Sequence, residues 1–273
     1  MGRAGRDTLP HVALLLLKLS LTPLLIGGAS LAARRWGPAV GGWLVALPLT
    51  SGPVALYLAI GQGNAFAAGS AKGSIAGLLG DATFALAYGL VARRAGWPVS
   101  VACGLAAFAA TALAMQPVLG APAVVVFGVV VVAMVVCLLL AVPAPEGNDT
   151  APAPAWDIPA RMVVGTGIVL SITAAAQTLG PSTSGLLAAL PVYVTVLAVF
   201  AHHLEGPGSA IHVVRGLQMG LFGTIVFFLV INSTIESLGI GVAFGAGLLA
   251  VVVVQTASLR LLRRPVDAAV GAP

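Results

Sequence analysis

The sequence predicts an all-α membrane protein, a polytopic bundle of about nine transmembrane helices in two inverted four-helix repeats joined by a linking helix. Three observations support this prediction. Hydrophobic residues make up 59% of the 273 residues and charged residues only 8%, whereas soluble domains carry about 25% charged residues. Apolar stretches close to the ~20 residues that cross a bilayer recur along the whole chain. The chain also aligns with itself, without a gap, when position 37 is placed on position 180.

This internal alignment, which we call the repeat register, indicates a duplicated membrane unit. The stretch GPAVGGWLVALP (37–48) falls on GPSTSGLLAALP (180–191), and positions 37–107 and 180–250 share 21 identities in 71 pairs. Internal repeats are a common architecture of secondary transporters, in which the solute site lies between the repeats. We therefore expect the duplication to determine both the fold and the position of the site.

Nine apolar segments are expected to span the membrane. They are 12–33, 39–60, 67–91, 98–116, 121–142, 161–179, 183–203, 209–232 and 238–259. The first four form repeat one (1–118) and the last four form repeat two (161–259). The fifth span and a polar loop link them (119–160), and a basic tail follows (260–273). A signal peptide is the less favoured interpretation of the first span, because Lys18 interrupts its apolar run.

The distribution of basic residues predicts the orientation. An odd number of spans between two repeats inverts the second repeat, and the basic pairs of repeat one are replaced in repeat two by non-basic residues. The residues compared are Arg34, Arg35, Arg93 and Arg94 against Gln177, Thr178, Glu236 and Ser237, with Arg215, Arg260, Arg263 and Arg264 on the other loops of repeat two. Cytoplasmic loops are enriched in Lys and Arg, so we expect an external N-terminus and a cytoplasmic C-terminus. Arg3 and Arg6 oppose this orientation.

Two aligned cations do not follow that topology signal. Lys72 and Arg215 share one repeat position, yet the inverted arrangement places them on opposite sides of the membrane. Each begins a K/R-G-x-x-x-G-x-x-G pattern, whose glycines favour close helix packing. The cations either extend to the lipid headgroups or attract an anionic solute at the two mouths of a pathway.

Two aligned prolines predict interrupted helices. Pro48 and Pro191 lie within an Ala-Leu-Pro sequence in both repeats, followed by Ser51 in the first and Tyr193 in the second. A proline inside a helix removes a hydrogen bond and leaves a carbonyl free, and matched interruptions in two halves point to a transporter's central site. A purely structural kink is the alternative.

Asp81 is the acidic residue most clearly inside an apolar run. A carboxylate there is costly unless it is protonated, paired or in contact with water, so Asp81 is a candidate proton carrier. A structural ion pair is the alternative. The cluster His202, His203, Glu205 and His212 is interpreted as a wet loop, because its spacing matches no compact metal motif.

The sequence contains no Walker loop, nucleophile elbow, HExxH or dinucleotide fingerprint. We therefore expect neither an enzyme nor a bound metal or cofactor, and Cys103 and Cys137 are expected to be core residues. The net charge of +5 comes mainly from arginines that flank apolar spans, so no nucleic-acid partner is expected. Abundant Arg, Ala, Gly and Val fit a bacterial inner membrane.

The GxLxALP stretch, followed by a second span and a small-residue helix, resembles uncharacterised short four-helix bacterial inner-membrane proteins, here as two fused copies. Such a resemblance implies no particular substrate. In plan the chain is also similar to the duplicated drug and metabolite exporters, which have two five-helix halves, although a clear match to their motifs is missing.

The predicted function is a secondary transporter or exporter of a small solute, with an anion as one candidate. Its expected site residues are Pro48, Ser51, Lys72, Asp81, Pro191, Tyr193 and Arg215. The alternative is a non-enzymatic membrane partner or assembly protein, in which the glycines serve only packing. Besides the lipid bilayer and the solute, a second copy of the chain is a possible partner.

Overall fold

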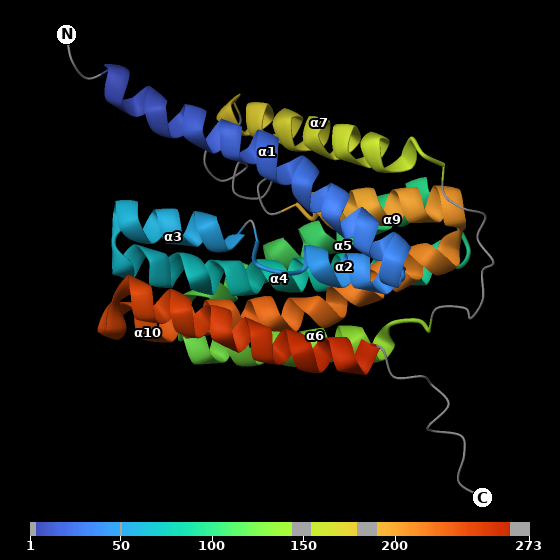
Figure 1. Cartoon of the computed structure of the whole chain (residues 1–273). Coiled ribbons are helices and arrows are strands. Elements are labelled where there is room, and N and C mark those ends of the chain that lie inside the picture. Colours follow the sequence, from blue (N-terminus) through green and yellow to red (C-terminus); the bar gives the residue numbers. More distant parts are fainter. Residues whose placement is uncertain (1–3, 50, 144–153, 179–189, 263–273) are drawn as a thin grey trace, which may run out of the picture.

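The computed structural model describes residues 4–49, 51–143, 154–178 and 190–262, and every regular element in these ranges is helical, as predicted (Figure 1). The elements are α1 (Ala4–Trp36), α2 (Pro38–Val45), α3 (Ser51–Gln62), α4 (Asn64–Ala92), α5 (Trp97–Met115), the 3₁₀ helix η1 (Val118–Gly120), α6 (Ala123–Leu140), α7 (Asp157–Thr178), α9 (Val192–Glu205) and α10 (Pro207–Leu262). Within these ranges five helices, α4, α5, α6, α7 and α10, are long and apolar enough to cross a membrane. The chain is a helical membrane protein.

One of the expected spans differs from the prediction. The span expected at 39–60 is two helices, α2 and α3, separated by a turn around Pro48. The spans expected at 209–232 and 238–259 are the two parts of α10, which meet at Gly239, where the backbone is not helical (φ 77°, ψ 174°). The start of the span expected at 183–203 lies outside the described residues, as do most of the polar loop and of the basic tail.

The helix boundaries recur in the repeat register. Gly63, between α3 and α4, has a φ of 90°, and Gly206, between α9 and α10, has a φ of 97°. Both positions need a left-handed backbone, which glycine adopts without strain. A packing contact recurs as well: a Cβ on Gly104 would lie 2.8 Å from the Phe84 ring, and one on Gly247 would lie 3.0 Å from the Phe227 ring. At these two pairs of aligned positions the local structure is therefore the same.

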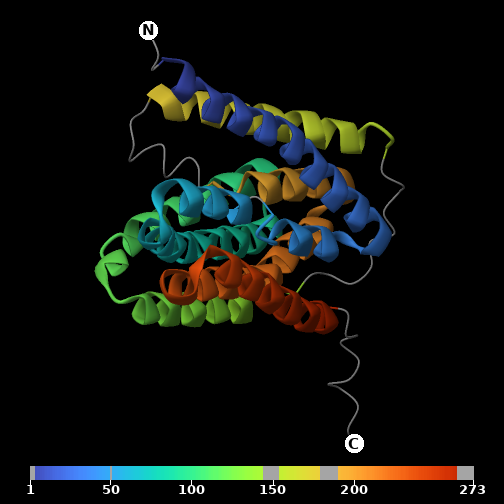
Figure 2. The same ribbon diagram turned by 60° about the vertical axis from the view of Figure 1, so that its left-hand side comes forward.

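Helix α4 and the first half of α10, which occupy equivalent positions in the alignment, run antiparallel in the centre of the bundle. Side-chain amides link them along their length. Asn64 Nδ2 donates to the Ile235 carbonyl at 3.0 Å, Asn232 Nδ2 to the Ala68 carbonyl at 2.8 Å, and Gln218 Nε2 to the Ala82 carbonyl at 3.3 Å. Helices α1 and α7, also equivalent in the alignment, lie side by side at the edge of the bundle (Figure 2).

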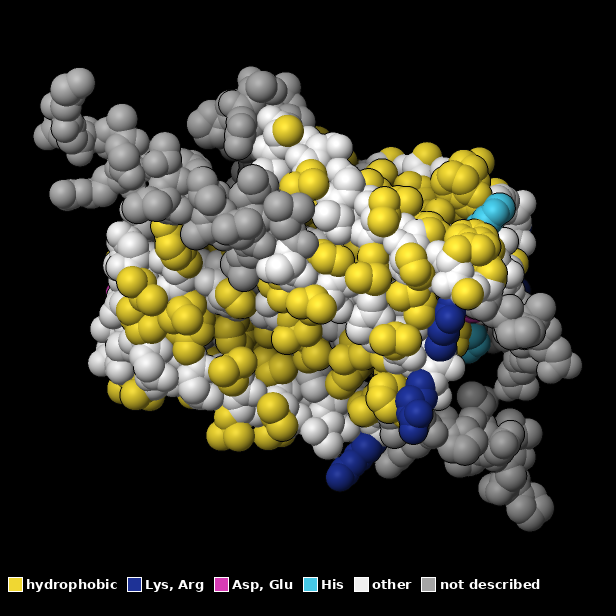
Figure 3. Space-filling model, turned by 45° about the horizontal axis from the view of Figure 1, so that its top comes forward, with side chains coloured by type: hydrophobic (Ala, Val, Ile, Leu, Met, Phe, Trp, Pro, Cys, Tyr) yellow, Lys and Arg dark blue, Asp and Glu magenta, His cyan; other side chains and the backbone are white. Residues whose placement is uncertain are grey.

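Seven arginines of the described part gather at one end of the bundle, whereas Arg6 lies in the first turn of α1, at the opposite end. Arg34 and Arg35 end α1, Arg93 and Arg94 follow α4, Arg161 lies in the first turns of α7, and Arg215 and Arg260 lie toward the two ends of α10. Hydrophobic side chains spread over the length of the face in Figure 3, and the basic side chains visible there lie together at one end. Lys72 lies toward the other end, beside the connection between η1 and α6.

The glycines predicted to pack helices do so mainly in α10. A Cβ on Gly216 would overlap the Ala39 carbonyl of α2, and one on Gly220 would lie 2.6 Å from the Trp43 carbonyl. Gly42 brings α2 equally close to the Val213 carbonyl of α10. In α4, by contrast, a Cβ on Gly73 or Gly77 meets no described atom within 4 Å. The segment equivalent to α2 in the second half lies outside the described residues.

We expect Gly216→Ala to destabilise the protein, because the new methyl group would force α2 away from α10. Overpacking of this kind costs about 1–3 kcal/mol. Thermal unfolding of the purified protein in detergent measures the effect. Gly245→Ala is the matched control, since Gly245 lies exposed on the same helix and a Cβ there meets nothing within 4 Å. Equal unfolding midpoints for the two variants would contradict the close contact.

Candidate functional site

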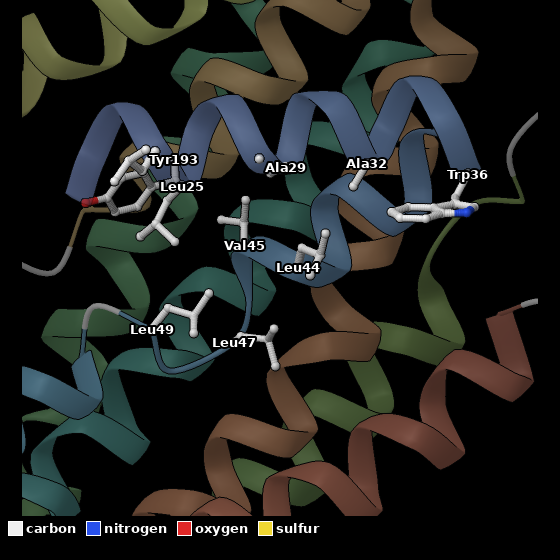
Figure 4. A pocket seen from close by; sticks show the side chains of 11 residues that line it. Leu25, Ala29, Ala32, Trp36, Leu44, Val45, Leu47, Leu49 and Tyr193 are labelled. Atoms are coloured by element: carbon white, nitrogen blue, oxygen red, sulfur yellow. The ribbon is translucent and has the colours of Figure 1, made fainter. Parts of the chain in front are cut away.

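A cavity of about 240 Å³ lies between α1 and the broken helix pair α2 and α3. We call it the α1 pocket (Figure 4). One face of α1 forms one wall, α2 and the turn after it form the other, and Tyr193 of α9 closes one end. The lining residues are Leu24, Leu25, Gly28, Ala29, Ala32, Trp36, Leu44, Val45, Leu47, Leu49 and Tyr193.

The turn at Pro48 shapes one wall of the α1 pocket. Pro48 is buried, and its neighbours Leu47 and Leu49 line the cavity. The Pro48 carbonyl accepts the Gly52 amide at 2.9 Å, which starts α3. Because the chain is not helical from Ala46 to Leu49, it leaves a gap that a continuous helix would have filled.

Pro191 has the same role at the start of α9. Its carbonyl accepts the Thr195 amide at 3.0 Å and the Thr195 hydroxyl at 2.7 Å. Since Pro191 and Thr195 align with Pro48 and Gly52, α3 and α9 begin with the same hydrogen bond. Tyr193, in the first turn of α9, lies against α1, where its hydroxyl is 3.2 Å from Thr22 Oγ1. The structure thus brings the Pro48 turn and Tyr193 to one cavity.

The chemistry of the α1 pocket is apolar. Its walls are aliphatic side chains, and Trp36 and Tyr193 lie toward its two ends. The polar groups of the lining side chains are the Tyr193 hydroxyl, with Thr22 beside it, and the Trp36 indole N–H, and no Lys or Arg is among the lining residues. Pockets of this kind bind small molecules through apolar contact, with a few polar groups that fix orientation.

The remaining predicted site residues lie elsewhere. Ser51, in the first turn of α3, is half-buried and does not line the pocket. Lys72 Nζ donates to the Ala121 carbonyl at 3.2 Å, so it holds the connection before α6 in place. Arg215 is half-buried on α10, near the end where the other arginines gather. Lys72 and Arg215 therefore lie toward opposite ends of the bundle, and neither lies at the α1 pocket.

Asp81 lies in the middle of α4. Its Oδ1 atom is buried and makes no hydrogen bond within the described part of the chain. The aligned residue, Thr224 on α10, donates its hydroxyl to the Ala46 carbonyl at the end of α2, next to the Pro48 break. That carbonyl is one of those that a helix end leaves without an intrahelical partner. The position aligned with Asp81 thus stabilises the interrupted helix of the first half.

An ion network that the sequence analysis missed joins α1, α7 and α9. Asp157 accepts Arg161 Nε at 2.6 Å and Arg34 Nη2 at 3.1 Å, and Arg161 Nη2 lies 3.8 Å from Glu205. Asp157 and Arg161 are only 1% and 4% exposed. The spacing of four residues between them is the one signal in the sequence, since i and i+4 side chains are neighbours on a helix. From the sequence alone, Arg34 was interpreted only as a residue that indicates the orientation of the chain in the membrane.

The histidine cluster does not converge on one point. His202 Nδ1 lies 3.2 Å from the Tyr88 hydroxyl, which also lies 3.2 Å from the Ala198 carbonyl. Glu205 is oriented toward Arg161 instead. Within the described ranges, no group of three His, Cys, Asp or Glu side chains could hold a metal ion. These polar contacts link α4, α7 and α9 at the arginine-bearing end.

The fold and the apolar pocket define the class, a helical membrane protein with a small cavity beside an interrupted helix. Comparison with known proteins adds no closer assignment. No family model matches the chain, and neither a curated protein nor a solved structure matches it.

Proposed function

We propose that this protein is a secondary transporter of a small solute, built from two inverted repeats, and that the α1 pocket binds the solute. The observation that supports this most strongly is the pair of aligned prolines. Pro48 lies in the turn between α2 and α3, Pro191 lies directly before α9, and residues close to both prolines line one cavity. Interrupted helices in corresponding positions of two halves are characteristic of transporter binding sites.

The recurrence of local structure supports the inverted arrangement. Helix boundaries and glycine contacts recur in the repeat register, and the equivalent helices α4 and α10 are antiparallel. Alternating access in inverted repeats is a rocking of one half against the other. The lining residues of α1 belong to the first half and Tyr193 belongs to the second, so such a rocking would change the width of the pocket.

The lining of the pocket favours an apolar or amphipathic solute over an anion. Desolvating an anion without a cation or several donors is costly, and the cations Lys72 and Arg215 lie away from the pocket. The Tyr193 hydroxyl suits a solute with one polar group. In this proposal Lys72 stabilises a loop and Arg215 belongs to the basic end.

The gathering of arginines supports the proposed orientation in a bacterial inner membrane. By the positive-inside rule, the end that carries Arg34, Arg93 and Arg260 faces the cytoplasm. The N-terminus of α1 then lies outside, and the end of α10 lies inside.

Asp81 is the proposed proton carrier. A carboxyl with one buried oxygen that makes no hydrogen bond must be either protonated or reached by water, and a residue that alternates between these two conditions can couple solute movement to a proton gradient. Asp81→Asn keeps the shape of the side chain and removes the titratable proton, so transport by this variant should no longer respond to a pH gradient.

Reconstitution tests this proposal directly. Purified protein in proteoliposomes is assayed with a lipophilic cation, a neutral amphiphile and an organic anion, each with and without an imposed pH gradient. We expect protein-dependent flux of the neutral amphiphile, stimulated by the gradient in the wild type but not in Asp81→Asn. If no compound moves and a stoichiometric partner co-purifies, the protein is instead a non-enzymatic membrane partner. Flux of the cation or of the anion alone would contradict the apolar site, because no charged residue lines it.

A further inference from the structure

A second apolar cavity, of about 460 Å³, lies on the outside of the bundle between α5 and α7, with α9 as its floor. We call it the α5–α7 groove. Side chains from three helices form it: Trp97 and Val101 on α5, Val164 and Ile168 on α7, and Thr195, Val196, Val199, Phe200 and His203 on α9. Trp97, Val164 and Ile168 are 39%, 44% and 37% exposed. The groove is therefore open to the surroundings of the protein.

The length of the groove matches one leaflet of a bilayer. Along α9 the lining runs from His203 to Thr195, which is about 12 Å at 1.5 Å per residue. Half of a ~30 Å hydrocarbon core is about 15 Å. His203 and Trp97 mark the end of the groove at the arginine-bearing end of the bundle, and tryptophan there suits the level of the headgroups.

Positive charge lies at this end of the groove. Arg93 and Arg94 are exposed on the turn between α4 and α5, and Arg94 is three residues before Trp97. Among the described residues neither arginine takes part in an ion pair. The nearby network of Arg34, Arg161, Asp157 and Glu205 balances two cations with two carboxylates, so it leaves the charge of Arg93 and Arg94 uncompensated. Thr195 is satisfied by the Pro191 carbonyl, and the groove below His203 is apolar.

We infer that the α5–α7 groove binds one anionic phospholipid of the leaflet at the arginine-bearing end. An acyl chain fills the groove between Val101 and Val164, and the headgroup phosphate lies against Arg93, Arg94 and His203. Basic pockets between transmembrane helices bind anionic headgroups in this way. A lipid is favoured because the walls of the groove are apolar and about as long as one leaflet is thick. An anionic headgroup is favoured because Arg93 and Arg94 lie at the end of the groove. This binding site does not depend on the transport proposal.

Native mass spectrometry of the full chain in detergent tests the site, with phosphatidylglycerol and phosphatidylcholine of identical acyl chains as probes. We expect the wild type to retain one phosphatidylglycerol at about tenfold lower lipid concentration than phosphatidylcholine. The double variant Arg93→Gln and Arg94→Gln should lose this preference, and Val164→Trp should weaken retention of both lipids by filling the groove.

Two exposed positions on α10 supply matched controls. Arg260→Gln removes an arginine at the same end of the bundle, and Val253→Trp adds a tryptophan to a side chain that is 63% exposed. Both variants should retain lipid as the wild type does. Because every altered position is exposed, each variant should elute as a single folded species. Equal retention of the two lipids by the wild type, survival of the preference in the double arginine variant, or an equal loss in Val253→Trp and Val164→Trp would overturn the proposal.

Discussion

Replacing Asp157 with asparagine is expected to lower the free energy of unfolding by about 3–5 kcal/mol, because it leaves buried positive charge uncompensated. Arg161 is 4% exposed and would keep only Glu205, at 3.8 Å, as a carboxylate partner. Arg34 would lose the partner that ties α1 to α7. Asparagine has nearly the same shape as aspartate, so the effect reports the charge rather than a cavity. Thermal or denaturant unfolding in detergent measures it.

Glu236→Gln is the control for this prediction. Glu236 is an exposed carboxylate of α10, and among the described residues it takes part in no ion pair. Exposed charges contribute about 0–1 kcal/mol, so this variant should unfold with the wild type. If Asp157→Asn is no less stable than Glu236→Gln, the ion pairs of Asp157 do not contribute to stability. Apolar packing alone then holds α1, α7 and α9 together.

Replacing Gly28 with leucine is expected to reduce solute flux at least tenfold while leaving the fold intact. Gly28 lines the α1 pocket, and a Cβ at this position meets no described atom within 4 Å. The leucine side chain therefore occupies the cavity of about 240 Å³ rather than displacing a helix. The measurement is flux of the transported compound in proteoliposomes, at equal amounts of reconstituted protein.

Gly167→Leu is the matched control for the pocket. Gly167 is an exposed glycine of α7, where a Cβ also meets nothing within 4 Å, and it does not line the pocket. The two variants add the same side chain to helices of the same kind. A decrease of flux in Gly28→Leu alone supports the α1 pocket as the solute site. Unchanged flux in Gly28→Leu would show that the α1 pocket is not the solute site.

The sequence predicted the helices well where apolar length decides the structure. The starts of α4 and α5, the position of α6 and the broad extent of α7 agree with the expected spans within a few residues. The interruption between α2 and α3 was also indicated by Pro48, and the segment before Pro191 lies outside the described residues. The sequence could not show that the span at 39–60 separates into two helices, because a proline in a membrane helix is compatible with a kink as well as with a break.

The candidate site was predicted only in part, for a physical reason. The neighbours of Pro48 and the side chain of Tyr193 line one cavity, but Lys72 and Asp81 lie away from it. Charge and proline stand out in an apolar sequence, whereas the wall of an apolar cavity consists of Leu, Ala and Gly, which are common everywhere in this chain. Asp157 and Arg161 were missed because Asp157 falls in the segment assigned to the polar loop (119–160) and Arg161 at the start of the span expected at 161–179.

The sequence by itself determined that this is a helical membrane protein, since low charge and long apolar segments leave no other way to satisfy the backbone in a bilayer. It also determined the repeat register in which local structure recurs. Only the tertiary structure decided which repeated features act together. The same glycine pattern packs α2 tightly against α10 but leaves a Cβ on Gly73 without a described neighbour within 4 Å. Of the two aligned cations, Lys72 contacts the connection before α6, whereas Arg215 lies at the arginine-bearing end of the bundle. Local sequence determines where helices begin and end, whereas the contacts of each side chain depend on which helix lies opposite it.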